Sequence, residues 1–574
     1  MSDRRTRRHD LDLPVREKRG HCPHREVRLL GFAVLPLLLG LVFFAASLTP
    51  SLIPRHWLFQ GVLAGLVTGV GYMLGQLFLS AWRAIELPLL RGKAARVAHS
   101  LVAIPVLALW VWDVSQASKW QDTIRLRVGM DPSEDYRTLG MLGLAVAVFL
   151  FCFLIGWMVQ ELFDILRSRL YRVMPARTAN VLGLMLAVSV VFVVTRDGIV
   201  AWAFDAADES YEAAQDLFAT APPAPDDPDT AGGPGSFVDW AAMGQPGRNF
   251  VTQGPTAADI SALSGAPALD PIRVYVGRAQ DDDPEVRAQI ALEELKRLGA
   301  FDRKVLIVAS PTGTGWLDPG GHDPIEYLHN GDIATVAVQY SYLQSPLALI
   351  FETASGLDQA TDTMRVIYQH WRSLPVDDRP QFYVHGISLG AWSSMYSFDL
   401  FQLIDDPIQG ALWTGPPFPS NLWRRMVAAR DQGSPYVLPQ VGDGSLVRFM
   451  SQFDGPNLDN DDWGRLRIVF MQQGSDPIVF YEPSSVWRAP QWMREPPAPD
   501  VSPAMRFVPV VTQFQLALDL ALSKALPQGY GHNYIARDYI DGWIAVTAPE
   551  GWTAEQTKRL KTWCSLDWGL GCRK

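Results

Sequence analysis

Only four cysteines occur among the 574 residues, and none lies in a C-x-x-C pair or at a Cys/His spacing typical of a metal site. The G-x-x-x-x-G-K-[ST] loop that binds nucleoside phosphates is also missing. Acidic residues outnumber basic ones, and the net charge of −10 argues against nucleic acid as a partner. No repeat period is evident. We therefore expect a protein that needs no metal, no other cofactor and no nucleic acid.

The amino-terminal part has long apolar runs that a soluble core would not expose so continuously. About five of them are long enough to cross a hydrocarbon layer of about 30 Å. They run from Leu29 to Leu48, Leu58 to Leu79, Val97 to Val114, Leu139 to Phe163 and Asn180 to Trp202. The second run carries one glycine stripe from Gly61 to Gly69 and another at Gly71 and Gly75, which predicts close packing of helices within a bundle. The sequence thus predicts a basic tail (residues 1–28) and an α-helical transmembrane bundle (29–204).

Basic residues around these runs predict the orientation of the bundle. Arg and Lys are concentrated in the tail and in the loops 83–96 and 167–177, as expected for the cytoplasmic side of a membrane. An odd number of spans would carry everything after Trp202 to the outer side. Arg196 and Asp197 closely follow the apolar part of the last run, and without that span the remaining chain would be cytoplasmic.

The two cysteines near the carboxyl end bear on the same question. Cys564 and Cys572 lie close enough in sequence to form a small-loop disulfide. Such a bond is plausible in an oxidising compartment, and free thiols are the alternative. The pair therefore agrees weakly with an outer location for this half.

Residues 205–270 are rich in Ala, Pro, Asp and Gly, and we interpret them as a linker off the membrane. Beyond Arg273 the pattern alternates between short apolar strands and helices such as 285–298 and 356–373. Alternating units of this kind predict a mainly parallel sheet covered by helices on both faces. We expect one α/β domain over residues 271–574.

The most informative motif of that domain is Gly386-Ile-Ser-Leu-Gly390, which stands between an apolar strand and a helix start rich in small residues. This arrangement is typical of a nucleophile elbow, a strained turn that exposes the Ser388 hydroxyl above the sheet edge. The flanking glycines avoid collisions with the neighbouring strand and helix. Because the five-residue pattern alone is weak, the surrounding sequence must support it.

Two residues downstream could complete a catalytic triad with Ser388. Asp476 follows an apolar strand (465–472), so it is expected at the carboxyl edge of the sheet. His532 lies in a glycine-flanked loop after a helical run that ends near Leu526. A serine needs an imidazole to take its proton, and the imidazole needs a carboxylate to fix its tautomer. The order Ser, Asp, His is that of α/β-hydrolases.

Each of these residues also has a structural interpretation. Asp476 in Gly-Ser-Asp-Pro could simply cap a turn or a helix, and His532 could be an ordinary loop residue. His385, just before the elbow, is expected to be packed and hydrogen-bonded rather than to act as the base. The occurrence of all three candidates in order, each at a strand end or in a loop, favours catalysis.

An oxyanion hole would need backbone N–H donors on both sides of the reacting carbonyl. Leu389, after the nucleophile, should supply one donor. The second should come from Thr312, Gly313 and Thr314, in a glycine-rich turn after the strand at 304–309. A plain tight turn or a phosphate-binding loop is the alternative for this segment.

Two long insertions, 418–462 and 486–507, follow strands of the predicted sheet and carry several aromatic residues and methionines. Insertions at these places can form apolar lids that suit acyl chains. The alternative is that these aromatics extend the core.

Several segments together resemble a family of bacterial membrane-anchored α/β-hydrolases with a multi-span amino-terminal domain and a carboxyl-terminal serine hydrolase domain, described as lipases or esterases. The resemblance spans most of the chain. It rests on Ser47-Leu-Thr-Pro-Ser-Leu-Ile-Pro-Arg55, Arg273-Val-Tyr-Val-Gly277, Ala309-Ser-Pro-Thr-Gly-Thr-Gly-Trp316 and the Ser388 elbow. It implies a triad of Ser388, Asp476 and His532, and it does not identify a substrate.

We therefore expect a serine hydrolase, embedded in the bacterial inner membrane, that cleaves an acyl ester of a lipid or envelope component. The catalytic domain is expected on the periplasmic side. An acyltransferase would use the same triad with another acceptor in place of water. A non-catalytic binding or scaffolding module of the envelope is the alternative of another class, although it would not need an aligned nucleophile, acid and base.

Overall fold

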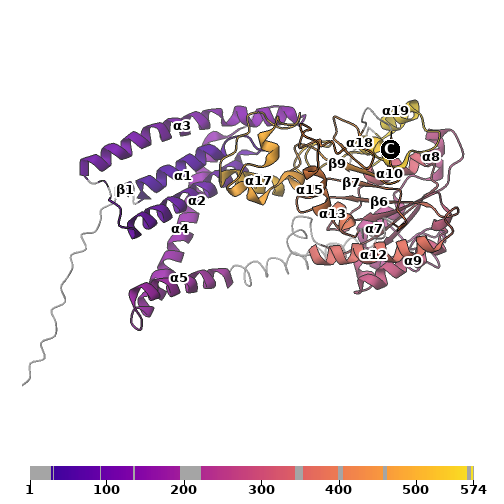
Figure 1. Ribbon diagram of the computed structural model, residues 1–574, viewed down its shortest axis with the longest axis horizontal. Helices are drawn as coiled ribbons and strands as arrows, with labels where there is room; N and C mark the ends of the chain where they lie inside the picture. Colours follow the sequence, from indigo (N-terminus) through magenta and orange to yellow (C-terminus); the bar gives the residue numbers. More distant parts are fainter. Residues whose placement is uncertain are drawn as a thin grey trace, which may run out of the picture.

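The computed structural model describes residues 28–29, 32–88, 90, 92–133, 136–193, 222–342, 353–397, 405–456, 462–564 and 571–572. Nearly all of the basic tail, the end of the fifth apolar run and the start of the expected linker lie outside these residues. The molecule is elongated, with a helical part at one end and an α/β part at the other (Figure 1).

The helical part begins with a short hairpin, β1 (Arg28–Leu29) and β2 (Phe32–Ala33). Its helices are α1 (Val34–Ser47), α2 (Trp57–Ala84), α3 (Gly92–Arg127), α4 (Thr138–Leu170) and α5 (Ala176–Val193). Two faces of α2 pack closely on neighbouring helices. A Cβ atom on residue 65 would lie 2.5 Å from the Ala145 carbonyl oxygen on α4, and one on residue 75 would lie 2.6 Å from Pro36 Cα on α1. Both glycine stripes thus pack inside the bundle, as the sequence predicts.

Three of the described helices, α2, α3 and α4, are long and apolar enough to cross a membrane. The expectation of about five spans is therefore not supported. Helix α1 has 14 residues and reaches only about 21 Å. In α5 the apolar stretch Thr178–Val190 is also short, and the rest of the fifth run lies outside the described residues.

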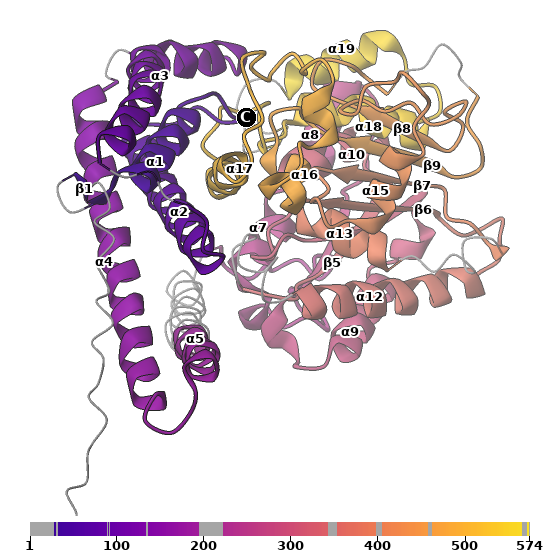
Figure 2. The same cartoon turned by 60° about the vertical axis from the view of Figure 1, so that its left-hand side comes forward.

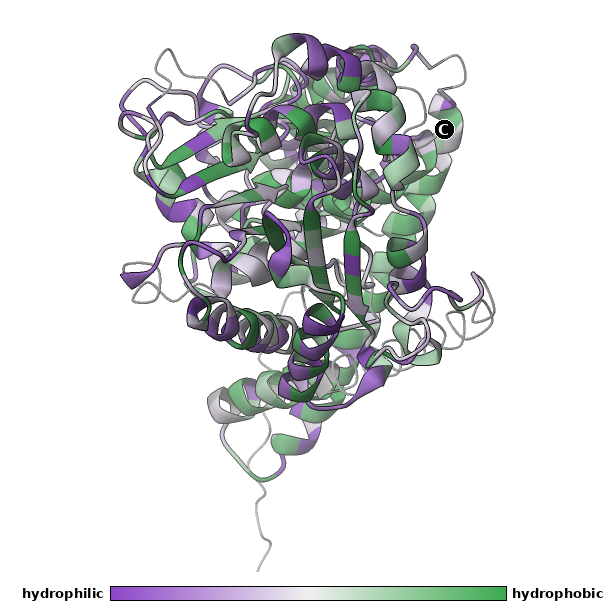
Figure 3. Ribbon diagram, turned by 90° about the vertical axis from the view of Figure 1, so that its right-hand side faces the viewer, coloured by the Kyte–Doolittle hydropathy of each residue, from purple (hydrophilic) through white to green (hydrophobic). Residues whose placement is uncertain are grey.

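A seven-stranded sheet forms the centre of the α/β part, with the order β3-β5-β4-β6-β7-β9-β8. Every neighbouring pair is parallel, as the alternating pattern predicts. The strands are β3 (Ile272–Val276), β4 (Val305–Ser310), β5 (Ile333–Val338), β6 (Gln381–Ile387), β7 (Gly410–Thr414), β8 (Val447–Met450) and β9 (Arg467–Met471). They are nearly all buried, and Figure 3 colours them largely as hydrophobic. Burial on both faces explains why these strands are apolar runs without alternation.

Helices cover both faces of the sheet (Figure 2). One layer contains α9 (Pro284–Arg297), α12 (Thr353–Ser373) and α13 (Leu389–Tyr396), and the other contains α10 (Pro319–Leu328), α18 (Ala536–Thr547) and α19 (Ala554–Trp563). The remaining α-helices are α7 (Gly244–Thr252), α8 (Ala257–Ser264), α15 (Asn421–Ala428), α16 (Pro477–Phe480) and α17 (Val511–Ala521). Short 3-10 helices are η2 (Ala241–Met243), η3 (Arg278–Gln280), η4 (Ala300–Asp302), η5 (Pro483–Val486) and η6 (Gln491–Arg494).

The segment expected as a linker is folded where the structure describes it. Met243, Phe250 and Ile260 are buried in the same core as the sheet. Arg248 is also buried and donates to the carbonyl oxygens of Trp240 and Ala241. Helices α7 and α8 therefore belong structurally to the α/β part.

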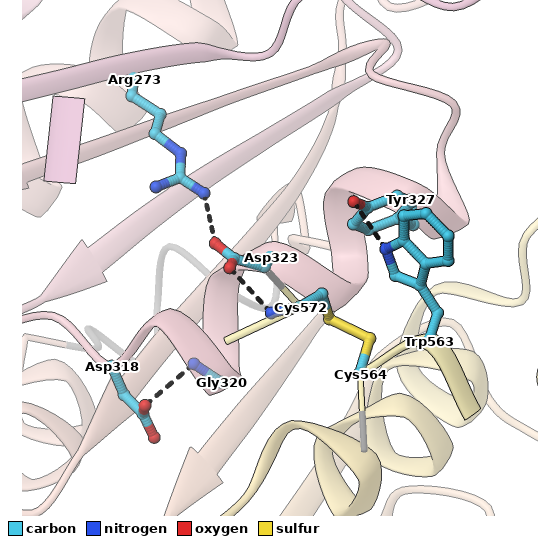
Figure 4. The surroundings of a disulfide bond; sticks show 8 residues. All are labelled: Arg273, Asp318, Gly320, Asp323, Tyr327, Trp563, Cys564 and Cys572. Carbon is cyan, nitrogen blue, oxygen red and sulfur yellow. Dashed lines mark hydrogen bonds and ion pairs between the residues drawn. A yellow bond between two sulfur atoms is a disulfide. The ribbon is translucent and has the colours of Figure 1, made fainter. Parts of the chain in front are cut away.

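Cys564 and Cys572 form a disulfide at the end of α19 (Figure 4). The backbone N–H of Cys572 donates to Asp323 Oδ2 (3.0 Å), and Asp323 also pairs with the buried Arg273 (2.7 Å). Trp563 Nε1 donates to the Tyr327 hydroxyl (3.0 Å). These two hydrogen bonds hold the disulfide-closed segment against α10.

Candidate active site

The segment that connects β6 to α13 has the geometry of a nucleophile elbow. Ser388, between the two elements, has φ 57° and ψ −127°. A residue other than glycine rarely adopts such a conformation, and it persists only where the surroundings enforce it. Its backbone N–H donates to the Thr414 carbonyl oxygen (2.9 Å), which holds the turn against the end of β7. A Cβ atom on residue 390 would lie 2.0 Å from the Ser310 carbonyl oxygen, so Gly390 lets α13 approach β4.

Asp476 lies at the same edge of the sheet, one turn after β9, and is fully buried. Its Oδ1 accepts from Ile478 N (2.8 Å) and caps α16. Its Oδ2 accepts from His532 Nδ1 (2.6 Å) and from the Tyr534 hydroxyl (2.8 Å). The helix-cap interpretation and the partnership with histidine therefore hold together, one for each carboxylate oxygen.

His532 is held in the orientation that a general base needs. Because Nδ1 binds Asp476, the tautomer with a proton on Nδ1 is favoured, and Nε2 is left as an acceptor. Nε2 is buried and has no hydrogen-bond partner among the described residues, Ser388 included. The imidazole packs on Gly415, where a Cβ atom would lie 2.7 Å from His532 Cε1. Gly415 directly follows Thr414, whose carbonyl binds Ser388, so the three sequence-predicted residues meet around the end of β7.

The predicted oxyanion donors differ in how their N–H groups are used. Thr312 N donates to the Trp316 carbonyl oxygen (3.0 Å), so it is already bonded within the turn. The N–H groups of Gly313 and Thr314 make no hydrogen bond within the described part of the chain. Leu389 is the first residue of α13, where a backbone N–H has no acceptor inside the helix. The donors that this geometry leaves open are therefore Leu389, Gly313 and Thr314.

His385, the other histidine near the elbow, is packed and hydrogen-bonded as expected. Its Nδ1 lies 2.7 Å from the Leu412 carbonyl oxygen, and its ring lies 5.1 Å from that of His322. Burial lowers the pKa of His385 to about 4. The His385 side chain is buried within β6, so we assign it to the core.

Sequence reasoning missed two residues that contact the Asp476–His532 pair. Tyr534 donates to Asp476, and Lys524 Nζ donates to the His532 carbonyl oxygen (2.9 Å). Burial lowers the pKa of Lys524, although nearby carboxylates oppose the shift. The position of Tyr534, two residues after the histidine, was a weak local signal, whereas Lys524 had none.

The two aromatic insertions are mostly core. Trp423 and Phe449 of the first insertion and Trp492 of the second are buried in the main cluster. Phe453 and Trp487 differ, since they are 46% and 72% exposed. The Phe453 ring lies 6.5 Å from that of Tyr530, which belongs to the loop that carries His532. The exposed Phe453 ring thus lies beside the loop that carries the candidate base.

Residues 272–560 match the α/β-hydrolase family, and residues 48–255 match a model described as the amino-terminal part of that family. The chain belongs to this α/β-hydrolase family. Ser388, Asp476 and His532 all lie within the matched hydrolase region. No curated protein and no solved structure matches the chain. Within the described residues, no group of His, Cys, Asp or Glu side chains is arranged to hold a metal ion.

Proposed function

We propose that this protein is a membrane-anchored serine hydrolase that cleaves a carboxylic ester through Ser388, His532 and Asp476. The observation that carries the proposal is the strained Ser388 turn beside an imidazole already oriented by a buried carboxylate. A binding or scaffolding module would have no need of this strain or of this buried pair.

In the proposed reaction Ser388 Oγ attacks the ester carbonyl while His532 Nε2 takes its proton. Asp476 stabilises the imidazolium, and the Tyr534 hydroxyl holds the same carboxylate oxygen. The proton then passes to the leaving alcohol, which leaves an acyl group on Ser388. Water, activated by the same imidazole, releases the acid and restores the serine. The hydrogen bond between serine and imidazole would form as substrate binds.

Negative charge on the carbonyl oxygen needs preorganised donors. Leu389 N–H, at the start of α13, would supply one of them, helped by the positive end of the helix dipole. Gly313 or Thr314 would supply the other from the turn after β4. This assignment leaves Thr312 with a structural role in the turn.

The substrate class follows from where the site lies. Apolar helices of the bundle stand next to the catalytic half (Figure 1). The exposed Phe453 ring lies against Tyr530 of the His532 loop, and the exposed Trp487 follows η5, which packs on α17. Such a surface suits an acyl chain that leaves a bilayer without crossing water. We therefore favour an ester of a lipid or of an acylated envelope component.

We place the catalytic half on the periplasmic side of the bacterial inner membrane. It meets the bundle at the end of α1 and the end of α3 (Figure 1), and the basic loop 83–96 lies between the opposite ends of α2 and α3. Basic loops stay in the cytoplasm, so the catalytic half should lie outside. The disulfide suits that oxidising compartment.

An acyltransferase is the second candidate, because Ser388 is only 3% exposed. Exclusion of water from the acyl-enzyme would favour transfer to a sugar or lipid hydroxyl. The triad chemistry up to the acyl-enzyme is the same. Product analysis with and without an added alcohol would separate the two activities.

A membrane-impermeant fluorophosphonate probe tests the proposal directly. Wild-type protein should be labelled in intact cells, and the Ser388→Ala variant should not be labelled in any preparation. Labelling only after lysis would place the site on the cytoplasmic side. If folded wild-type protein is not labelled even after lysis, the hydrolase mechanism is wrong.

A further inference from the structure

The loop between α1 and α2 leaves the bundle and meets α17, which stands between the two parts of the molecule (Figure 2). Asp519 of α17 is fully buried and accepts from Ser51 Oγ (2.9 Å) and from Leu52 N (2.9 Å). Arg55 Nε lies 3.8 Å from Asp519 Oδ1, and both side chains are fully buried. One helical turn earlier on α17, Gln515 Nε2 donates to the carbonyl oxygens of Ser47, at the end of α1, and Thr49, in the loop. A buried polar cluster thus joins residues 468 positions apart.

Burying this cluster costs desolvation free energy, because two charged groups are removed from water. Burial raises the pKa of Asp519 to about 6 and lowers the pKa of Arg55, so both charged forms are disfavoured there. Apolar contacts would anchor the catalytic half at a lower desolvation cost. A buried ion pair with several hydrogen bonds does, however, fix the orientation of the elements that it joins. Here it fixes α17 relative to the loop between α1 and α2.

Helix α17 leads directly into the loop that carries the candidate base. Lys524, three residues after the helix ends, donates to the His532 carbonyl oxygen (2.9 Å). Asn533, which directly follows His532, donates from Nδ2 to the Leu526 carbonyl oxygen (2.6 Å). His532 and the residue after it are therefore both tied to the chain that leaves α17, and a shift of α17 would move His532.

A second route runs from the end of α3 to the candidate acid. Arg127 Nη1 donates to the Pro499 carbonyl oxygen (2.8 Å). The adjacent Asp500 accepts from Ser475 N (2.8 Å), next to Asp476. Ser475 Oγ in turn accepts from Gly531 N (2.9 Å), next to His532. The bundle thus contacts the segments that hold both the acid and the base.

We propose that Asp519 is a positioning residue for His532: bound by Ser51 and Arg55 of the amino-terminal bundle, it fixes α17 and with it the loop that presents the imidazole. The proposal rests on the triad mechanism above. It makes the bundle a component of the active enzyme, because the base is aligned only while the α1–α2 loop is docked. An anchor alone would not need to reach the catalytic machinery.

The test compares Asp519 with a matched carboxylate elsewhere in the chain. Glu294 is also fully buried, accepts from a serine hydroxyl (Ser236) and a backbone N–H (Phe237), and pairs with an arginine (Arg297). It holds residues 236–237 to α9, and none of its hydrogen bonds reaches the loop that carries His532. Asp519→Ala and Glu294→Ala thus remove the same kinds of contact in two places.

Full-length proteins are purified in detergent, and the rate of Ser388 labelling by a fluorophosphonate is measured per folded molecule. Asp519→Ala should label about tenfold more slowly or worse, since a shift of about 1 Å in a catalytic group can cost a hundredfold. Ser51→Ala should slow labelling at least about fivefold, because Asp519 loses one hydrogen bond and Arg55 Nη2 loses its acceptor on Ser51. Asp519→Asn, which keeps one acceptor oxygen, should lie between Asp519→Ala and wild type. Glu294→Ala should lose stability but label at the wild-type rate.

With a soluble ester, the Asp519 and Ser51 variants should show a lower kcat and an unchanged KM, whereas Glu294→Ala should keep both wild-type values. If folded Asp519→Ala labels as fast as wild type, the positioning role is wrong. If that variant does not fold, wild-type rates in both Ser51→Ala and Asp519→Asn would overturn the proposal equally. Failure of the wild-type protein to label would instead contradict the serine mechanism, so the two ideas are judged separately.

Discussion

At the scale of single residues, Asp476 at the carboxyl edge of the sheet takes part in two structures at once. Asp476 caps α16 with one oxygen and binds His532 with the other. Tyr534 fills the remaining acceptor position on the second oxygen. A carboxylate so fully satisfied stays in place in its buried site, where an unpaired charge would be costly. The local helix cap and the long-range pair therefore support one another.

A buried carboxyl without such partners gives a test by pH. Burial raises the pKa of Asp538, on α18, to about 7. The folded state then binds its proton more tightly than the unfolded state. The contribution of Asp538 to the free energy of unfolding is therefore full below about pH 4 and is lost as the pH rises through 7. Asp538→Asn removes this dependence, so its melting temperature relative to wild type should rise between pH 5 and pH 8.5.

The expected change in relative stability across this range is about 2–3 kcal/mol. Thermal melts of both proteins in the same detergent give the measurement. Asp282→Asn is the control, because the side chain of Asp282 is exposed. Its melting temperature should follow that of wild type at every pH. If the difference in melting temperature between Asp538→Asn and wild type is the same at every pH, Asp538 has the same pKa in the folded and the unfolded state, and the prediction is wrong.

At the scale of elements, the β6–α13 turn depends on the absence of a side chain at residue 390. A Cβ atom there would lie 2.0 Å from the backbone of β4, which cannot move without disturbing the centre of the sheet. Gly390→Ala should therefore cost more than about 2 kcal/mol of stability and abolish labelling of Ser388. Gly455→Ala is the matched control, because a Cβ atom on residue 455 would meet nothing within 4 Å. Equal labelling of the two variants would contradict the elbow geometry.

The same elements show what the sequence could predict. The elbow, the strands and the order Ser388, Asp476, His532 follow from local patterns, because each depends on a few adjacent residues. The described residues do not support five spans, because hydropathy counts apolar residues and does not show where a helix begins: α1 starts only at Val34 and has 14 residues. Lys524 could not be predicted, since its contact with His532 depends on how the chain turns after α17. The pairing of Arg55 with Asp519 depends on the docking of two distant parts.

At the scale of the whole molecule, the bundle has a core of its own, but residues at one of its ends are buried in the core of the α/β part. Leu52, Ile53 and Val128, which come from the loop after α1 and the end of α3, lie in the same buried cluster as the sheet. A flexible tether would leave such residues exposed. The docked arrangement sets one end of the apolar helices against the α/β part (Figure 1). If the helices cross a membrane, their orientation therefore also determines the side on which the α/β part lies.

The oxidation state of Cys564 and Cys572 in living cells shows on which side of the membrane the α/β part lies. If residues 272–560 face the periplasm, Cys564 and Cys572 should be oxidised in the protein as it is made. Cells are first denatured with a light maleimide, and the protein is then reduced and treated with a heavy one. The heavy label should appear on Cys564 and Cys572, while Cys152, a free thiol, takes the light label and serves as the internal control. Light label on Cys564 and Cys572 would place the catalytic half in a reducing compartment, and the proposed orientation of the bundle would have to be reversed.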